Sequence, residues 1–265
     1  MFPITIYLSN LRLAPIQVTA VGHAATSQSP FIDYYAVDED FVGDPKTFSE
    51  KLILMPPDGM PHVPSARAAP IAPILREAPQ PVRIAIASSN MKLNPRFLGA
   101  LRKIAETCPV PLQFVFMPGF ARGVLYVQTR NVIWRYLPHA TVHTELPFDR
   151  YMAELNSCDL FLNPFPYGNM NSITDTAALG LAGICRTGPS LAEHIDEGMF
   201  ARLGLPKWLV AKTDEEYVAA AIRLATNHAE RLTLRRDLLA RDAVQVFYRG
   251  RPELLGEKFR ALVGG

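Results

Sequence analysis

From residue 82 onward, apolar runs of strand length alternate with stretches of helical periodicity. The runs are VRIAIA (82–87), LQFVF (112–116), DLFLNPF (159–165), GICR (183–186) and WLVA (208–211). Between them, apolar residues recur every three or four positions, as in PRFLGALRKIAETC (95–108) and SLAEHIDEGMFARLG (190–204). Strands that alternate with helices of this length predict βαβ units around a parallel sheet. The runs are predominantly apolar and do not alternate with polar residues, which is typical of strands covered on both faces.

The pattern differs before residue 82. Three short apolar runs, IQVTAVGH, FIDYYAVD and KLILMP, read as strands separated by glycine, proline and acidic turns, and helical periodicity is scarce. Six prolines then follow between Pro61 and Pro81, where an extended connector is expected because proline removes backbone donors. We therefore predict an α/β protein with an N-terminal domain over 1–60, a linker over 61–81 and a second domain over 82–265.

Charge and composition argue against several classes of function. The 265 residues carry 27 Lys and Arg and 25 Asp and Glu, for a net charge of +2. The basic residues form no patch or stripe, which argues against a nucleic-acid partner. No apolar run approaches the roughly 20 residues of a membrane span, and the N-terminus does not resemble a signal peptide. We expect a cytoplasmic protein whose three cysteines (Cys108, Cys158 and Cys185) are reduced and hold no metal.

The first candidate site is the corner ASSNMKLNP (87–95), directly after the strand VRIAIA. In an open α/β sheet, ligands bind outside the carboxyl ends of the strands. Ser88 and Ser89 lie at that end, and Lys92 precedes a helix that begins at Pro95. A lysine here can place its charge where a phosphate would bind. The alternative is a solvated lysine beside a capping Asn94.

The second candidate is the corner NPFPYGNMNSITD (163–175). Gly168 allows a close turn, and Asn169, Asn171 or Ser172 can cap the next helix. A helix start has free N–H groups and a partial positive charge, which suit a diphosphate. Asp175 falls on the same face as Asn171, within reach of ribose hydroxyls. The alternative is that the aspartate only stabilises the helix start.

A third corner, AVGHAATSQS (20–29), carries His23 on a turn rich in hydroxyl side chains. His23 is a candidate base, sugar ligand or phosphate donor, although a histidine in such a turn is more often structural. Other motifs give less. EHIDEG (193–198) lacks the second histidine of a zinc-binding HExxH motif, and no GxSxG motif of an α/β-hydrolase is present.

Several long segments resemble the O-GlcNAc transferase superfamily, the family 41 glycosyltransferases. They are RLAPIQVTAVGHAATSQSPFIDYYAVDEDFVG, FSEKLILMP, SSNMKLNPRFL, CDLFLNPFPYGNMNSITDT and GPSLAEHIDEGMFARLGLP. They occur in the family's order from about Leu8 to the C-terminus, and they look most like the bacterial HMW-type cytoplasmic protein N-glycosyltransferases.

The resemblance implies a GT-B fold, in which two Rossmann-like domains face one another and the C-terminal one binds a UDP-sugar. It implies an inverting transfer of a hexose, glucose or galactose, to a protein asparagine in an Asn-x-Ser/Thr sequence, without a metal or other cofactor. The other branch of the family transfers GlcNAc from UDP-GlcNAc to serine or threonine. A non-catalytic remnant that only binds nucleotide sugars is a further alternative.

The resemblance also assigns residues. Lys92 matches the lysine that pairs with the diphosphate, and Ser89 is the polar position just before it. Asn171 and Ser172 lie at the phosphate-binding helix start, and Asp175 matches the aspartate on the ribose. Three candidates for uracil contacts lie between residues 146 and 151: Leu146, Phe148 and Tyr151. The second proposed catalytic residue beside Lys92 is His23, in the family's GHPAT-like turn near the sugar and the acceptor.

Three departures from the family stand out. Ala24 replaces the usual proline in that turn, and HTELPF (143–148) has fewer histidines than known N-glycosyltransferases. Both bear on sugar choice and base contacts. Family members also have further strands and helices ahead of the position that matches Met1. We therefore expect the acceptor side to need a missing N-terminal segment or a partner chain.

Overall fold

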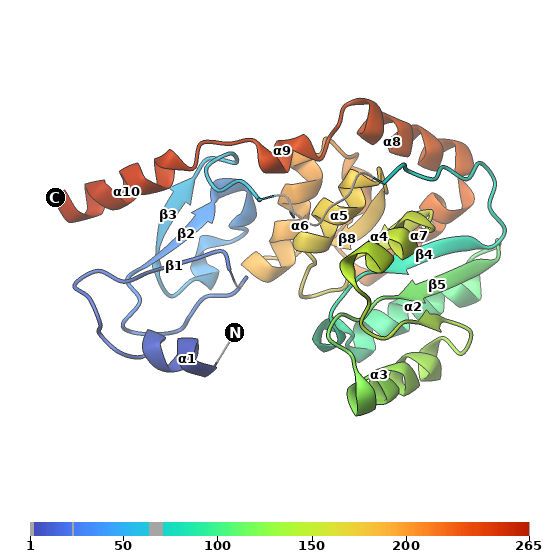
Figure 1. Ribbon diagram of the computed structural model, residues 1–265, viewed down its shortest axis with the longest axis horizontal. Coiled ribbons are helices and arrows are strands. Elements are labelled where there is room, and N and C mark those ends of the chain that lie inside the picture. Colours follow the sequence, from blue (N-terminus) through green and yellow to red (C-terminus); the bar gives the residue numbers. More distant parts are fainter. Residues whose placement is uncertain (1–2, 23, 64–70, 265) are drawn as a thin grey trace.

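The computed structural model describes residues 3–22, 24–63 and 71–264 (Figure 1). His23 lies outside the described residues. Two parallel sheets lie side by side, the first built from the N-terminal part of the chain and the second from the remainder (Figure 1). No helix in the described part of the chain is long and apolar enough to cross a membrane.

The first sheet has three parallel strands in the order β1-β2-β3. They are β1 (Val18–Ala20), β2 (Tyr34–Asp38) and β3 (Lys51–Met55). All three lie within the apolar runs that predicted strands. Two short 3₁₀ turns, η1 (Glu39–Phe41) and η2 (Pro45–Thr47), connect β2 to β3. A short helix, α1 (Pro3–Ser9), precedes the sheet, in a part of the chain where helical periodicity is scarce.

The second sheet has six parallel strands in the order β6-β5-β4-β7-β8-β9. They are β4 (Val82–Ile86), β5 (Leu112–Phe116), β6 (Thr141–Val142), β7 (Leu160–Leu162), β8 (Gly183–Arg186) and β9 (Val210–Ala211). The chain fills one side of β4 with β5 and β6, and then crosses to the other side with β7. The strand order therefore reverses between β4 and β7, which is where ligands bind in such sheets.

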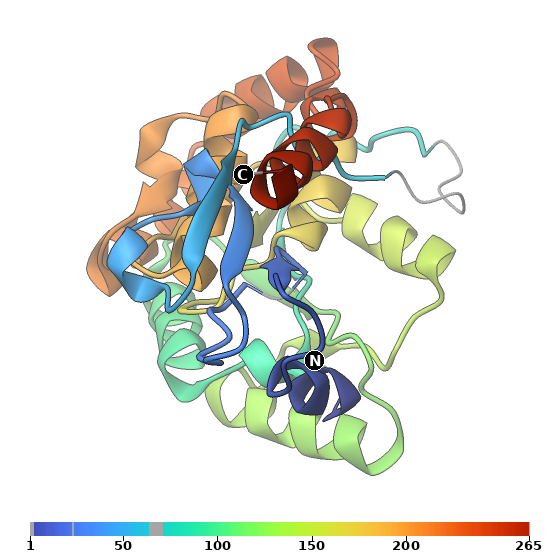
Figure 2. The same cartoon turned by 90° about the vertical axis from the view of Figure 1, so that its left-hand side faces the viewer.

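Helices cover both faces of this sheet (Figures 1 and 2). They are α2 (Pro95–Thr107), α3 (Gly123–Tyr136), α4 (Phe148–Asn156), α5 (Asn171–Ala178), α6 (Leu191–Arg202), α7 (Asp214–Thr226), α8 (His228–Ala240) and α9 (Gln245–Tyr248). The cover explains the continuous apolar strands, since Val82, Ile84 and Ile86 are fully buried. A 3₁₀ turn, η3 (Asn90–Lys92), links β4 to α2, and a second, η4 (Lys207–Leu209), precedes β9.

The stretch DEEYVAAAIRLATNHAERLTLRRDLLARDAV (214–244) has helical periodicity throughout, but the structure divides it into two helices and a following turn. α7 ends at Thr226, and Asn227 caps α8 by accepting the N–H of Glu230 at 3.1 Å. An asparagine satisfies a free N–H at a helix start, and the chain turns there instead of continuing as one long helix.

The C-terminal helix α10 (Glu253–Gly264) packs on the first sheet. Leu254, Leu255 and Phe259 contact a small core of Ala36, Ile53 and Met55. In both views α10 lies beside β3, and in Figure 1 the red C-terminal segment crosses from the second sheet to the first. The end of the region that we assign to the second domain thus returns to the first sheet. The three-part domain division itself stays a prediction.

A buried ion-pair cluster joins the two sheets. Arg202, at the end of α6, pairs with Asp38 Oδ2 at 2.7 Å and with Asp40 Oδ1 at 2.6 Å. Its guanidinium also lies 4.1 Å from the centre of the Phe41 ring. Arg202 and Asp38 are both almost fully buried, so this seam is shielded from solvent. The sheets are therefore held together by charge as well as by a shared apolar core.

Candidate functional site

A cavity of about 460 Å³ lies at the carboxyl ends of the second sheet's strands, beside the strand-order reversal. Its lining includes eight of the residues that the sequence singled out: Ser89, Lys92, Leu146, Phe148, Tyr151, Asn171, Ser172 and Asp175. They come from η3 and the residue before it, the loop before α4, α4 itself and α5. We call this space the donor cavity. The fold thus brings together residues that are up to 86 positions apart, from Ser89 to Asp175.

Asp175 and Tyr151 form one wall of the donor cavity. The Tyr151 hydroxyl donates a hydrogen bond to Asp175 Oδ2 at 3.0 Å. Burial raises the pKa of Asp175 to about 6, and the hydrogen bond from Tyr151 partly opposes the rise. The Tyr151 ring lies 6.1 Å from the ring of Phe148. This wall combines an aromatic surface with an oriented carboxylate, which is a suitable lining for a nucleoside.

Serine hydroxyls occupy the end of β4. Ser172 Oγ donates to the carbonyl oxygen of Ala87 at 2.8 Å and so ties α5 to this strand. Ser88 also lines the donor cavity, and its buried hydroxyl has no hydrogen-bond partner among the described residues. A buried hydroxyl without a partner is costly, so Ser88 is an additional candidate for a ligand contact. The sequence placed Ser88 at the strand end but did not select it.

Lys92 is a mostly buried cation at the edge of the donor cavity. Its Nζ donates to the carbonyl oxygen of Gly168 and lies 4.9 Å from the centre of the Tyr167 ring. Burial lowers the pKa of Lys92, while the negative charge of Asp196 raises it. A cation in such a low-dielectric place interacts strongly with an incoming anion.

The sequence predicted that backbone N–H groups at the start of α5 are free to bind a diphosphate. In the structure, several of them are already hydrogen-bonded. The backbone N–H groups of Asn169 and Met170 donate to the carboxylate of Asp196. Those of Ser172 and Ile173 donate to backbone carbonyls one turn earlier. Four N–H groups at this helix start are therefore occupied within the protein. Lys92 and the dipole of α5 remain as the groups that can attract an anion.

A second cavity of about 780 Å³ adjoins the first and opens between the two sheets. The two cavities share Ser89, Lys92, Asn169 and Asn171. From the first sheet's side, Val21, Gly22, Ala24, Met60 and His62 line the second cavity. The Ala24 N–H donates to the Tyr167 hydroxyl at 3.1 Å, which ties the two sides together. Tyr167 and His62 were not predicted as site residues, because they meet Lys92 at this cavity only in the folded chain.

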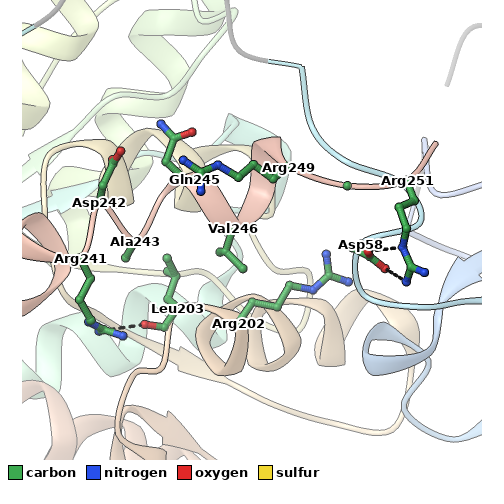
Figure 3. Close-up of a pocket in the computed structure, with 11 residues that line it drawn as sticks. Asp58, Arg202, Leu203, Arg241, Asp242, Ala243, Gln245, Val246, Arg249 and Arg251 are labelled. Atoms are coloured by element: carbon green, nitrogen blue, oxygen red, sulfur yellow. Dashed lines mark hydrogen bonds and ion pairs between the residues drawn. The ribbon is translucent and has the colours of Figure 1, made fainter.

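A third cavity of about 620 Å³, rich in arginine, lies at the seam with the C-terminal segment (Figure 3). Arg202 is paired with Asp38 and Asp40, as described above. Arg251 pairs with Asp58 at 2.6 Å, and Arg241 donates to the carbonyl oxygen of Leu203 at 3.2 Å (Figure 3). Carboxylates and helix-terminal carbonyls thus account for three of the four arginines in its lining, so this cavity is a structural seam.

Metal and thiol chemistry find little support in the described residues. Among them, no group of three or more His, Cys, Asp or Glu side chains is arranged to hold a metal ion. The cysteines are free thiols. Burial raises the pKa of Cys158 to about 12 and also raises that of Cys185, so neither forms a reactive thiolate near neutral pH.

Curated proteins similar to this chain are glycosyltransferases. A UDP-glucose:protein N-beta-glucosyltransferase of Actinobacillus pleuropneumoniae is 47% identical over 257 residues, which cover 96% of this chain and 42% of that protein. A probable UDP-N-acetylglucosamine–peptide N-acetylglucosaminyltransferase SPINDLY of Hordeum vulgare is 24% identical over 86% of this chain and 25% of that protein. The chain is similar over most of its length to proteins of the O-GlcNAc transferase superfamily.

The structural comparison confirms the fold expected for this superfamily. An O-GlcNAc transferase of Thermobaculum terrenum superimposes with a TM-score of 0.72 at 18% sequence identity, covering 94% of this chain and 48% of that one. The α/β, GT-B type prediction is therefore correct. No protein-family model matches the chain. The chain spans about two fifths of the length of the Actinobacillus relative.

Proposed function

We propose that this chain is a UDP-sugar-dependent protein glycosyltransferase that transfers a hexose, glucose or galactose, to asparagine side chains with inversion and without a metal. The observation that carries the proposal is the convergence of the eight predicted residues on the donor cavity. The 47% identity to a UDP-glucose:protein N-beta-glucosyltransferase supports the choice of sugar class and acceptor. We also propose that the protein acts in the cytoplasm.

The donor cavity is assigned to the UDP part of the donor. The uracil ring would lie against Leu146, Phe148 and Tyr151, and the ribose hydroxyls would donate to Asp175. The diphosphate would then reach Lys92 and the start of α5, where a cation and a helix dipole favour negative charge. This order along the cavity leaves the hexose at the boundary with the second cavity, which Lys92 also lines.

The second cavity is assigned to the hexose and the acceptor. In an inverting displacement, the acceptor nitrogen attacks the anomeric carbon from the side opposite the leaving UDP. The bond from that carbon to the phosphate oxygen breaks, and the electron pair leaves with UDP. Lys92 stabilises the charge that develops on this oxygen because its charge is already in place before the reaction. The acceptor nitrogen gives up a proton as the new bond forms, and we propose His23 as the base that accepts it.

Binding and transfer should be tested separately. Thermal melting with UDP, UDP-glucose, UDP-galactose, UDP-GlcNAc and GDP should show stabilisation by the UDP compounds alone, because a ligand that binds only the folded state raises the melting temperature. Mass spectrometry should then detect one added hexose on an Asn-x-Thr peptide, and none on the matching Gln-x-Thr peptide. Absence of any shift with UDP compounds would contradict the proposal at the donor cavity. A shift without transfer would favour the non-catalytic remnant.

The alternative function is transfer of GlcNAc from UDP-GlcNAc to serine or threonine. The similarity to proteins of the SPINDLY group supports it. The same assay distinguishes the two activities, since a GlcNAc adduct on an asparagine-free, serine-containing peptide would establish the alternative.

A further inference from the structure

Asp196 of α6 is a buried carboxylate that holds the corner before α5. Its side chain is 1% exposed, and its oxygens accept the N–H of Asn169 at 2.9 and 3.0 Å and the N–H of Met170 at 3.2 Å. Asp196 belongs to the segment EHIDEG (193–198), which lacks the second histidine of a zinc-binding motif. In the structure, the aspartate of this segment accepts hydrogen bonds from the backbone at the corner of the donor cavity.

The corner is shaped around this carboxylate. A Cβ atom on Gly168 would lie 2.5 Å from Asp196 Oδ1, a distance that no side chain can occupy without displacing the aspartate. Met170 has a φ of 30°, a conformation that non-glycine residues rarely adopt. Two charge-assisted hydrogen bonds from the corner to Asp196 oppose that strain. The position of Asn169 and Asn171 in the cavity linings therefore depends on Asp196.

Asp196 also influences Lys92 through its charge. The two groups attract one another, and the N–H groups of Met170 and Asn169 stabilise the carboxylate. Burial outweighs these effects and raises the pKa of Asp196 to about 6. Cys185 of β8 and Tyr217 of α7 also lie near Asp196, and burial raises the pKa of each well above its ordinary value, so both are neutral near pH 7. Asn163 also stabilises the carboxylate by a hydrogen bond, and Lys92 is the cation whose charge acts on it.

We propose that Asp196 is a positioning residue of the donor site, which holds the 168–170 backbone and competes with the donor's diphosphate for the charge of Lys92. This inference rests on the proposed donor-binding function. When a diphosphate binds near Lys92, a second negative charge approaches Asp196 and favours its protonated form. Donor binding is then coupled to the uptake of a proton by Asp196.

The pH dependence of donor affinity through Asp196 is opposite in sign to that through Asp175. A proton on Oδ2 leaves Oδ1 free to accept the N–H groups of Asn169 and Met170, so the corner is kept while the charge that competes for Lys92 is removed. Donor affinity through this group therefore rises as the pH falls through about 6. Asp175 accepts hydrogen bonds best when ionised, so affinity through this group rises as the pH increases through about 6. A UDP-hexose suits the test, because its diphosphate carries no group that titrates in this range.

The experiment is calorimetric titration of UDP-glucose at about pH 5.5, 6.5 and 7.5, each in two buffers of different ionisation enthalpy. We expect the Asp175→Asn variant still to take up a proton when UDP-glucose binds. Its affinity for UDP-glucose should rise by up to about tenfold for each unit by which the pH falls, as expected for one linked proton. The double variant Asp175→Asn with Asp196→Asn should lose both the uptake and this pH dependence. Asp38→Asn is the control, since Asp38 is another buried aspartate whose pKa is about 6 but which belongs to the Arg202 seam. It should leave proton uptake unchanged.

Two outcomes would overturn the inference while leaving the proposed function intact. One is UDP-glucose binding without proton uptake in Asp175→Asn. The other is an unchanged uptake when Asp196 is also replaced. If the double variant does not fold, Asp175→Asn combined with Gly168→Ala takes its place, because the added Cβ displaces the Asp196 carboxylate without removing its charge. An unchanged proton uptake in that variant would overturn the inference. Failure of the unaltered protein to bind any UDP compound would instead contradict the proposed function.

Discussion

Lys92 shows how one residue depends on its surroundings for its chemistry. It is a cation on a short 3₁₀ turn that is mostly buried and fixed by a carbonyl oxygen and an aromatic ring. A solvated lysine at the same sequence position would be screened by water and would cost little to remove. Its burial beside the donor cavity is what makes it a candidate for stabilising a leaving diphosphate.

Lys92→Ala should reduce hexose transfer by about 10²- to 10³-fold, the usual effect of removing one preorganised electrostatic contact. The variant should still unfold cooperatively, since the alanine leaves the apolar core unchanged. Initial rates at saturating donor, together with a melting curve, measure both. Lys103→Ala is the matched control, because Lys103 is an exposed lysine on α2. Equal rates for the two variants would contradict the role of Lys92.

Asp175→Asn should separate stability from binding. The pKa of Asp175 in the folded protein, about 6, lies above its ordinary value of 3.8, so the stability that comes with its protonated form is lost as the pH rises through about 6. The asparagine carries no charge, so the variant should melt several degrees above the unaltered protein at about pH 7.5 and close to it at about pH 4. UDP-glucose should nevertheless bind it more weakly at pH 7.5.

Melting curves without ligand at the two pH values test the stability part of this prediction. Asp237→Asn is the control, since its side chain is exposed on α8. A variant that melts below the unaltered protein at pH 7.5 would show that the charged form of Asp175 stabilises the fold.

At the scale of elements, local pattern determined much of what could be predicted. Strands β4, β5, β7 and β8 are short apolar runs, and α2 and α6 have clear starts at Pro95 and Ser190, so their sequence alone is informative. α3 was missed because several of its apolar residues, among them Val124 and Val132, face solvent and blur the helical period. β6 has only two residues, too few for a pattern.

The candidate site was predictable for a related reason. Its residues stand at strand ends and helix starts, which the sequence marks with serine, asparagine, glycine and proline. The partners of those residues were not predictable. Asp196 meets Met170 from 26 positions away and His62 lines a cavity with Lys92, and such proximities exist only in the folded chain.

Asn94 links an element to the site, and its replacement should affect both. Its Oδ1 caps α2 by accepting the N–H of Phe97 at 3.0 Å, and its Nδ2 donates to the carbonyl oxygen of Phe165 at 2.7 Å, on the approach to the corner. Asn94→Ala should cost about 1 kcal/mol for the cap and more for the unpaired carbonyl. It should also raise the KM for the donor.

Asn94→Asp separates the two hydrogen bonds. The aspartate keeps the cap of α2 but has no N–H group to donate to the carbonyl oxygen of Phe165. Urea unfolding and donor KM should show restored stability from the cap with a KM that stays raised. Asn227→Ala removes the cap of α8 and serves as the control, with a similar loss of stability and an unchanged KM. A normal KM in Asn94→Asp would contradict the proposed link.

For the molecule as a whole, the relation between the two sheets decides whether the second cavity keeps its form, because residues from both sides line it. Arg202, Asp38 and Asp40 form a largely buried ion-pair cluster that links the two sheets. A buried ion pair adds little stability relative to an apolar replacement, yet removal of one partner leaves an uncompensated charge. The seam should therefore respond to single and double substitutions in a strongly non-additive way.

Arg202→Met should destabilise the protein by about 3–5 kcal/mol, because Asp38 and Asp40 then lose their shared cation and Asp38 remains buried. Adding Asp38→Asn should recover part of that loss, since the unpaired buried charge is gone. Urea unfolding of both single variants and of the double variant measures the coupling as a double-mutant cycle. A double variant that loses the full sum of the single effects would show that the two residues act independently. Recovery of stability without recovery of donor turnover would show that Arg202 is also needed to hold the second cavity in its active form.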